Sequence, residues 1–216
     1  MNVDTLLHQY FSQAENLCIE MFDEKNIQQV YLRLVRVLIH QPEIETSLLQ
    51  AMSYCFYEVM DNVLIHSGKN NGIVITDYSE EQHIIRILVA DDGIGIQASL
   101  AQNEEYAGIS ETEALKYCIK DKVSDGKGLG FGLYSTSRLI NTAGHKLIIR
   151  SGSHTLSANG DMSVYESHPW QGTIIYFEVR SNLEIDPSSI VEHRTDPAEE
   201  FDELFLDGDS GINELW

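Results

Sequence analysis

Basic residues are scarce in this chain of 216 residues. It has 14 Lys and Arg against 34 Asp and Glu, which gives a formal net charge of −20. A surface this negative repels phosphate backbones and anionic lipid, so we expect neither a nucleic-acid partner nor a membrane partner. A small local pocket for a nucleotide is still compatible with that charge.

Cysteine is rare and long apolar runs are missing. Cys18, Cys55 and Cys118 are far apart and form neither a disulfide framework nor a metal-binding pair, which suits a reducing compartment. Apolar runs fall far short of the ~20 residues of a membrane span. The first ten residues lack the basic-then-apolar pattern of a secretory signal, so we expect a cytoplasmic protein. The 43% hydrophobic content is sufficient for a globular core.

The two ends of the chain differ from its centre. From Asp4 to Arg36 apolar residues recur at helical spacing, which predicts two helices separated near residues 23–26. We expect this helical segment, residues 1–45, to pack on the main domain or to provide a self-association surface. Residues 184–216 hold eleven acidic residues and one Arg. This composition predicts a solvated, mostly disordered tail with one short helix over 198–206.

The centre, residues 46–183, predicts one α/β (α+β) domain: a two-layer sandwich in which helices cover one face of a mixed, mostly antiparallel sheet. A helix capped by Thr46 or Ser47 should run to about His66. Another should end near Gly144, and a short one should lie near 112–119. The strand signals lie at 73–78, 84–90, 146–150 and 173–179, with a weaker one near 162–165.

The first motif lies on the predicted helix that ends at His66. Glu58, Asn62 and His66 are four residues apart and therefore share one face of that helix. An Asn oxygen can complete the coordination of Mg²⁺ that phosphates already hold. One turn away, Glu58 can orient or deprotonate a hydroxyl or a water. Taken alone, the same spacing also fits the polar face of an ordinary amphipathic helix.

The second motif is the turn Asp91-Asp92-Gly93-Ile94-Gly95, which follows an apolar strand. The carboxylate of Asp91 can accept a hydrogen bond from an exocyclic amine, and Gly93 and Gly95 let a planar ring approach the backbone. The third motif, Gly126–Leu133, has glycine at every second position before a helix, which favours an anion site. Each motif alone also fits an ordinary turn or a flexible loop.

The order of these motifs resembles that of the Bergerat-fold (GHKL) ATPase superfamily, which groups gyrase B subunits, the large heat-shock chaperone, MutL and sensor histidine kinases. Residues 58–66 resemble its N box, and 91–95 resemble its first glycine box. The run GKGLGFGL at 126–133 resembles its second glycine box, and Gly172-Thr173 its closing Gly-Thr motif. The resemblance extends over about residues 48–179 and implies a Bergerat ATP-binding fold in the domain 46–183.

The resemblance also implies a role for each matching residue. Glu58 would be the general base, Asn62 would bind Mg²⁺, and Asp91 would receive the adenine amino group. Residues 96–125 would form a mobile ATP lid. The implied nucleotide-binding residues are Asn62, Asp91, Gly93, Gly95, Lys127, Gly128, Leu129, Gly130, Gly132 and Thr173.

The use of ATP remains open between three readings. The pattern E-x-x-x-N-x-x-x-H resembles anti-sigma-factor serine kinases, small domains that phosphorylate Ser or Thr of a partner protein. Glu58 with Asp61 and Asn62 equally resembles gyrase and MutL, in which ATP hydrolysis drives dimer closure. A binding module with little turnover is the third reading. A histidine kinase is disfavoured, because only His8 and His40 precede the N box and neither lies in the expected stretch. We expect a regulatory, signalling protein, with a kinase acting on a partner protein as the first choice and a homodimer as a possibility.

Overall fold

A five-stranded antiparallel sheet forms the frame of the computed structural model, which describes residues 2–127, 132–159 and 161–190. The strand order is β1-β2-β3-β5-β4, and every pairing between these strands is antiparallel. The predicted hairpin and the later strands are present, and β4 and β5 are much longer than predicted. Their bounds are β1 Cys18–Asp23, β2 Asn71–Ser79, β3 Ile84–Ala90, β4 Gly144–Asn159 and β5 Asp161–Arg180.

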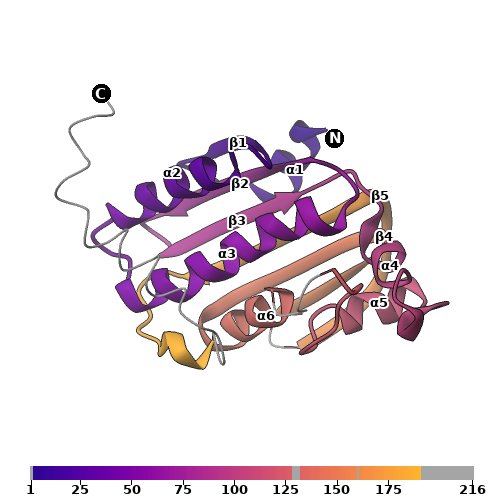
Figure 1. The fold of residues 1–216 in the computed structure, drawn as a ribbon. Helices are drawn as coiled ribbons and strands as arrows, with labels where there is room; N and C mark the ends of the chain where they lie inside the picture. The colour runs from indigo at the N-terminus through magenta and orange to yellow at the C-terminus, as the bar shows by residue number, and fades with distance from the viewer. Residues whose placement is uncertain (1, 128–131, 160, 191–216) are drawn as a thin grey trace.

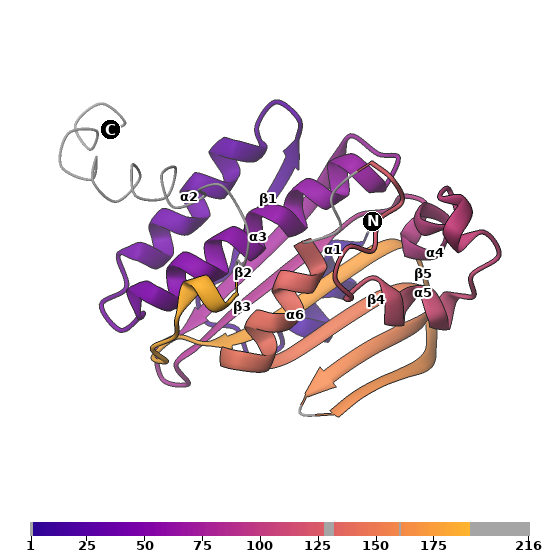
Figure 2. The ribbon, with the colours of Figure 1, turned by 60° about the horizontal axis from the view of Figure 1, so that its bottom comes forward.

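Helices α2 (Ile27–Ile39), α3 (Thr46–His66) and α6 (Gly132–Ala143) lie side by side over one face of the sheet (Figures 1 and 2). The main core fills the space between these helices and the strands. Two smaller helices, α4 (Gly95–Leu100) and α5 (Glu111–Tyr117), lie beyond the end of α3, with a 3-10 turn at Glu104–Tyr106 between them. The predicted two-layer α/β fold is therefore confirmed.

Helix α3 lies between α2 and α6 in this layer. It buries one face against the sheet because its apolar residues recur at three- and four-residue intervals. Leu48, Met52, Phe56 and Val59 are all completely buried. The helix runs over Thr46–His66, as predicted, but the predicted cap is wrong. Its N-cap is Glu45, which makes no side-chain cap hydrogen bond, and the Ser47 hydroxyl instead accepts from the N–H of Ile185 at 3.2 Å.

The two helices predicted in the N-terminal segment are present, but the first is much shorter than predicted, and an unpredicted strand lies between them. Helix α1 ends at Tyr10, and the edge strand β1 then pairs with β2 from Cys18↔Thr76 to Asp23↔Asn71. Its buried residue Phe22 packs beneath α2, whereas Ile19 and Met21 are exposed. So short a strand with apolar side chains on both faces has no clear alternation, and the surrounding helical spacing dominates the pattern.

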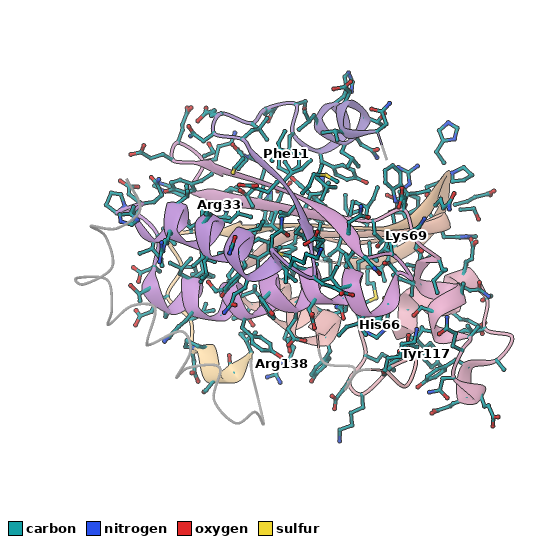
Figure 3. All side chains as sticks on the ribbon, turned by 45° about the horizontal axis from the view of Figure 1, so that its top comes forward. Phe11, Arg33, His66, Lys69, Tyr117 and Arg138 are labelled. Atoms are coloured by element: carbon teal, nitrogen blue, oxygen red, sulfur yellow. The ribbon has the colours of Figure 1, made fainter. Side chains whose placement is uncertain are left out.

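Helix α1 (Val3–Tyr10) covers the opposite face of the sheet. Leu6, Tyr10 and Phe11 form a second, smaller core with strand residues such as Ile75 and Tyr176. Phe11 is labelled in Figure 3. The loop after α1 is fixed by buried Asp77, whose Oδ1 accepts from the backbone N–H of residues 15 and 16 at 3.0 and 2.8 Å. The N-terminal segment thus contributes β1 to the sheet, α2 to the helix layer, and α1 to the face of the sheet that the predicted layer leaves uncovered.

The last residue that the structure describes is Ile190. It follows a 3-10 turn, Pro187–Ser189, and is buried in the main core. The short helix predicted over 198–206 lies outside the described residues. Among the helices that the structure describes, none is long and apolar enough to cross a lipid bilayer.

Candidate functional site

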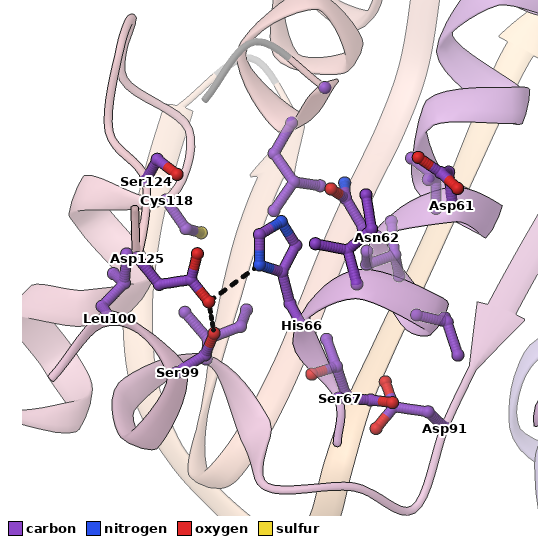
Figure 4. A pocket seen from close by; sticks show the side chains of 18 of the residues that line it. Asp61, Asn62, His66, Ser67, Asp91, Ser99, Leu100, Cys118, Ser124 and Asp125 are labelled. Atoms are coloured by element: carbon purple, nitrogen blue, oxygen red, sulfur yellow. Dashed lines mark hydrogen bonds and ion pairs between the residues drawn. The ribbon is translucent and has the colours of Figure 1, made fainter. Parts of the chain in front are cut away.

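A cavity of about 280 Å³ lies beside the C-terminal half of α3 (Figure 4). Its walls come from α3, the segment from Gly95 to Asp125, the start of α6, and strand β5. This volume is near the lower end of the range for small-molecule pockets. The cavity brings together predicted site residues that are far apart in the sequence: Glu58, Asn62, Asp91, Gly95, Gly132 and Thr173.

Glycine at the first position of α6 lets this helix start against the polar face of α3. A Cβ at position 132 would lie 3.0 Å from Asn62 Nδ2 and 3.2 Å from Glu58 Oε2. A larger side chain would therefore separate the two helices or displace these polar groups. The amide end of α6, which attracts negative charge, consequently lies close to the carboxylate and the carboxamide.

Glu58 has an unusually basic carboxylate. Burial raises its pKa to about 7, and the nearby carboxylate of Asp61 adds to the shift. A group with a pKa near 7 is close to half ionised at neutral pH, which suits a general base. Asp61 lines the same cavity, and burial also raises its pKa.

Asp91 follows the last residue of β3 and is 3% exposed. Its Oδ1 accepts from the N–H of Gly93 at 2.7 Å, and its own N–H donates to the carbonyl of Thr173 at 2.9 Å. The indole Nε1 of Trp170 donates to the Asp91 carbonyl at 3.0 Å. Burial raises the pKa of Asp91 to about 6, even though the hydrogen bonds from Gly93 and Thr173 lower it. The carboxylate is thus rigidly held at the cavity wall.

The model of the histidine kinase-, DNA gyrase B- and HSP90-like ATPase family matches residues 49–183, which is more than half of the chain. The chain belongs to this ATPase family. No curated protein matched it significantly. The family was predicted from the N box, the two glycine boxes and the Gly-Thr motif, and this prediction is confirmed.

The other predicted site residues of this ATPase either lie beside the cavity or are outside the residues that the structure describes. Gly93 is not among the lining residues of the cavity but contacts Asp91 through its N–H. Lys127 is directed toward Asp125: its N–H donates to Asp125 Oδ1 at 3.0 Å, and its Nζ lies 3.9 Å from Oδ2. The predicted phosphate contact of Lys127 therefore stays a prediction. Gly128, Leu129 and Gly130 lie outside the described residues.

Members of this ATPase family bind ATP, generally with Mg²⁺, and the residues present fit that pair. Asn62 offers an amide oxygen at the cavity wall, and Gly132 leaves open the space that a Cβ would fill. Magnesium in nucleotide sites takes most of its ligands from phosphate and water, with one or two from protein. Within the described ranges, no three His, Cys, Asp or Glu side chains form a metal cluster.

The segment predicted as the lid of this ATPase, residues 96–125, contains most of α4 and all of α5. Helix α5 begins with a capping box in which Ser110 and Glu113 exchange hydrogen bonds. Glu111 ties the segment to β4: its Oε2 accepts from the N–H of Ser153 at 3.0 Å and lies 2.7 Å from His154 Nδ1. The predicted lid segment is therefore attached to the long β4–β5 hairpin and also lines the cavity.

Two contacts at this site were not predicted from sequence. The Ser151 hydroxyl donates to the Gly172 carbonyl and accepts from the N–H of Ile96, both at 2.9 Å, so it joins the lid to the strand beside Asp91. At the end of α3, His66 Nδ1 lies 2.9 Å from Asp125 Oδ2 (Figure 4). The Ser151–Ile96 and His66–Asp125 contacts each join residues more than 50 positions apart, and no local pattern indicates such pairs.

Gly172 provides a test of how tightly Asp91 is enclosed. It has φ +92°, and a Cβ there would lie 2.3 Å from the Asp91 carbonyl oxygen. We expect Gly172→Ala to lower the free energy of unfolding by about 2–4 kcal/mol, from left-handed strain plus a backbone clash. Gly108→Ala is the matched control, because Gly108 has φ +81° but no neighbour within 4 Å, so only about 1 kcal/mol is expected. Urea denaturation measures both, and equal losses would contradict the clash.

Proposed function

We propose that this protein transfers the γ-phosphoryl group of ATP to a Ser or Thr hydroxyl of a regulatory partner protein. The observation that carries the proposal is the pairing of Glu58 and Asn62 on one face of α3, at the wall of the cavity. The pKa of Glu58, about 7, suits a base that must accept a proton from a hydroxyl at neutral pH.

Each proposed residue has a distinct task. Asp91 accepts a hydrogen bond from the exocyclic amine of adenine, while Thr173 supports the base from β5. Asn62 holds Mg²⁺, which neutralises charge on the phosphates when it is bound. Glu58 takes the proton of the acceptor hydroxyl as its oxygen bonds to the γ-phosphorus. The bond from that phosphorus to the β–γ bridging oxygen then breaks, and ADP leaves.

A second reading uses the same base with water as the nucleophile. It is supported by Asp61, which lines the cavity next to Glu58 and completes a carboxylate pair beside Asn62. In that reading ATP hydrolysis would drive closure of a homodimer. A binding module with little turnover would use the cavity without Glu58 acting as a base.

Labelled ATP separates these readings. The protein is incubated with γ-labelled ATP and a lysate, with and without Mg²⁺, and the expected result is Mg²⁺-dependent label on a partner protein. Label on Ser or Thr is stable to acid and labile to alkali, whereas label on His has the opposite behaviour. Free phosphate alone, released at a specific rate that rises steeply with protein concentration, would favour the dimer switch and contradict the kinase. The Glu58→Gln protein is the control for contaminating kinases.

A further inference from the structure

The carboxylate of Asp125 joins three segments that are distant in the sequence. Its Oδ2 accepts from the Ser99 hydroxyl at 2.8 Å and lies 2.9 Å from His66 Nδ1 (Figure 4). Its Oδ1 accepts from the N–H of Lys127 at 3.0 Å. The Asp125 side chain is only 1% exposed. One buried carboxylate therefore connects the end of α3, helix α4 and the residue that precedes 128–131.

These contacts determine the chemical state of the pair. Burial alone would raise the pKa of Asp125, but hydrogen bonds from His66, the Lys127 N–H and Ser99 outweigh it and hold the pKa below its usual value. Asp125 is therefore ionised at neutral pH and only accepts hydrogen bonds. His66 must then carry a proton on Nδ1, which leaves Nε2 as the other polar atom of a ring that lines the cavity.

A role for Asp125 in binding phosphate directly is disfavoured by its charge. An ionised carboxylate repels phosphate oxygens, and the Lys127 ammonium, 3.9 Å away and half exposed, offsets this only in part. Both carboxylate oxygens are already engaged by His66, Ser99 and the Lys127 N–H. The free-energy cost of burying this charge is instead offset by its hydrogen bonds with His66, Ser99 and the Lys127 N–H, which hold the lid segment in place.

The connected elements are those that would act on the phosphates. His66 is one helical turn beyond Asn62 on the same face of α3, and Ser99 and Asp125 lie near the two ends of the lid segment. A displacement of about 1 Å at such a site costs ~100-fold in rate. We propose that Asp125 is a positioning residue, which acts through His66 and Ser99 to hold both ends of the lid against the helix that carries Glu58 and Asn62. This inference rests on the proposed function, since it assumes that ATP reacts in the cavity.

Kinetics test the positioning role. We expect Asp125→Ala to lower kcat for ATP turnover about 10- to 100-fold, while the Kd for ADP changes less than about threefold. Asp125→Asn keeps an oxygen for the Lys127 N–H and should retain more activity. Because His66 and Asp125 would exert their effect through their mutual contact, we expect the double variant His66→Ala/Asp125→Ala to be no slower than Asp125→Ala alone. Multiplied losses would instead indicate that His66 contacts the nucleotide directly and would overturn the inference.

Proteolysis tests the tether without any activity. Lys120 and Lys122 are exposed on the lid, and trypsin should cleave after them several-fold faster in Asp125→Ala than in the unaltered protein, both without nucleotide. Glu104→Ala, an exposed lid carboxylate, is the matched control and should leave the rate unchanged. Equal rates in Asp125→Ala and the unaltered protein would overturn the tether. Unaltered protein that neither binds nor turns over ATP would overturn the proposed function, whatever trypsin shows.

Discussion

Asp91→Asn is expected to weaken Mg–ATP binding about 10- to 100-fold, because a charged hydrogen-bond acceptor contributes ~1.5–3 kcal/mol. The oxygen of the new amide would keep the N–H of Gly93, which lies 2.7 Å from Asp91 Oδ1. Its NH₂ group would then meet the exocyclic amine of adenine, so two donors would face each other. Isothermal titration calorimetry with ATP and Mg²⁺ measures this loss.

Inosine triphosphate is the control for the Asp91 prediction, since a carbonyl replaces the exocyclic amine of ATP. The unaltered carboxylate should reject that carbonyl, whereas the amide of Asp91→Asn can donate to it. We therefore expect the preference for ATP over ITP to shrink or reverse in the variant. An equal loss of both affinities, together with a lower denaturation midpoint, would show that the variant is merely destabilised and that Asp91 does not read the base.

Glu58→Gln is expected to lower kcat for phosphoryl transfer about 10²- to 10⁴-fold and to change the Kd of Mg–ATP less than about threefold. The amide is nearly the same size as the carboxylate but cannot accept the proton of the attacking hydroxyl. Transfer of label and calorimetry measure the two quantities separately. Glu45→Gln is the matched control, because Glu45 is exposed and adjoins the other end of the same helix. Unchanged turnover in Glu58→Gln would contradict both enzymatic readings and leave only the binding module.

The raised pKa of Glu58 determines the direction in which activity changes with pH. Its pKa is raised to about 7, so the protonated, inactive form predominates below that pH and the basic form above it. The rate kcat/KM of the unaltered protein should therefore fall about tenfold per pH unit below 7 and level off above it. Glu58→Gln should remove this dependence. Protonation of Asp91, whose pKa is about 6, adds a further loss at more acidic pH.

The predicted site residues that line the cavity share a local signal in the sequence. Glu58 and Asn62 were found because a four-residue interval places them on one helix face. Asp91 was found because it follows an apolar strand and precedes glycines that the turn requires. Short-range geometry of this kind depends on the backbone alone and can be predicted before the tertiary fold is known.

The partners of these residues depend on the tertiary fold and were missed. Trp170 and Asp91 are 79 residues apart, and Ser151 and Ile96 are 55 apart. Their contacts arise only when β5 pairs with β3 and α4 packs on the sheet, which no local spacing encodes. Strand β1 was missed for a related reason, since its place at the sheet edge is set by pairing with β2.

The indole of Trp170 gives the protein an intrinsic optical probe. Its Nε1 donates to the carbonyl of Asp91, while its ring packs against the small core beneath α1. The sequence contains only one other tryptophan, Trp216. With Trp216→Phe, the remaining fluorophore would be hydrogen-bonded to the residue that we propose binds the adenine amine, and would report on it from the opposite face of the sheet.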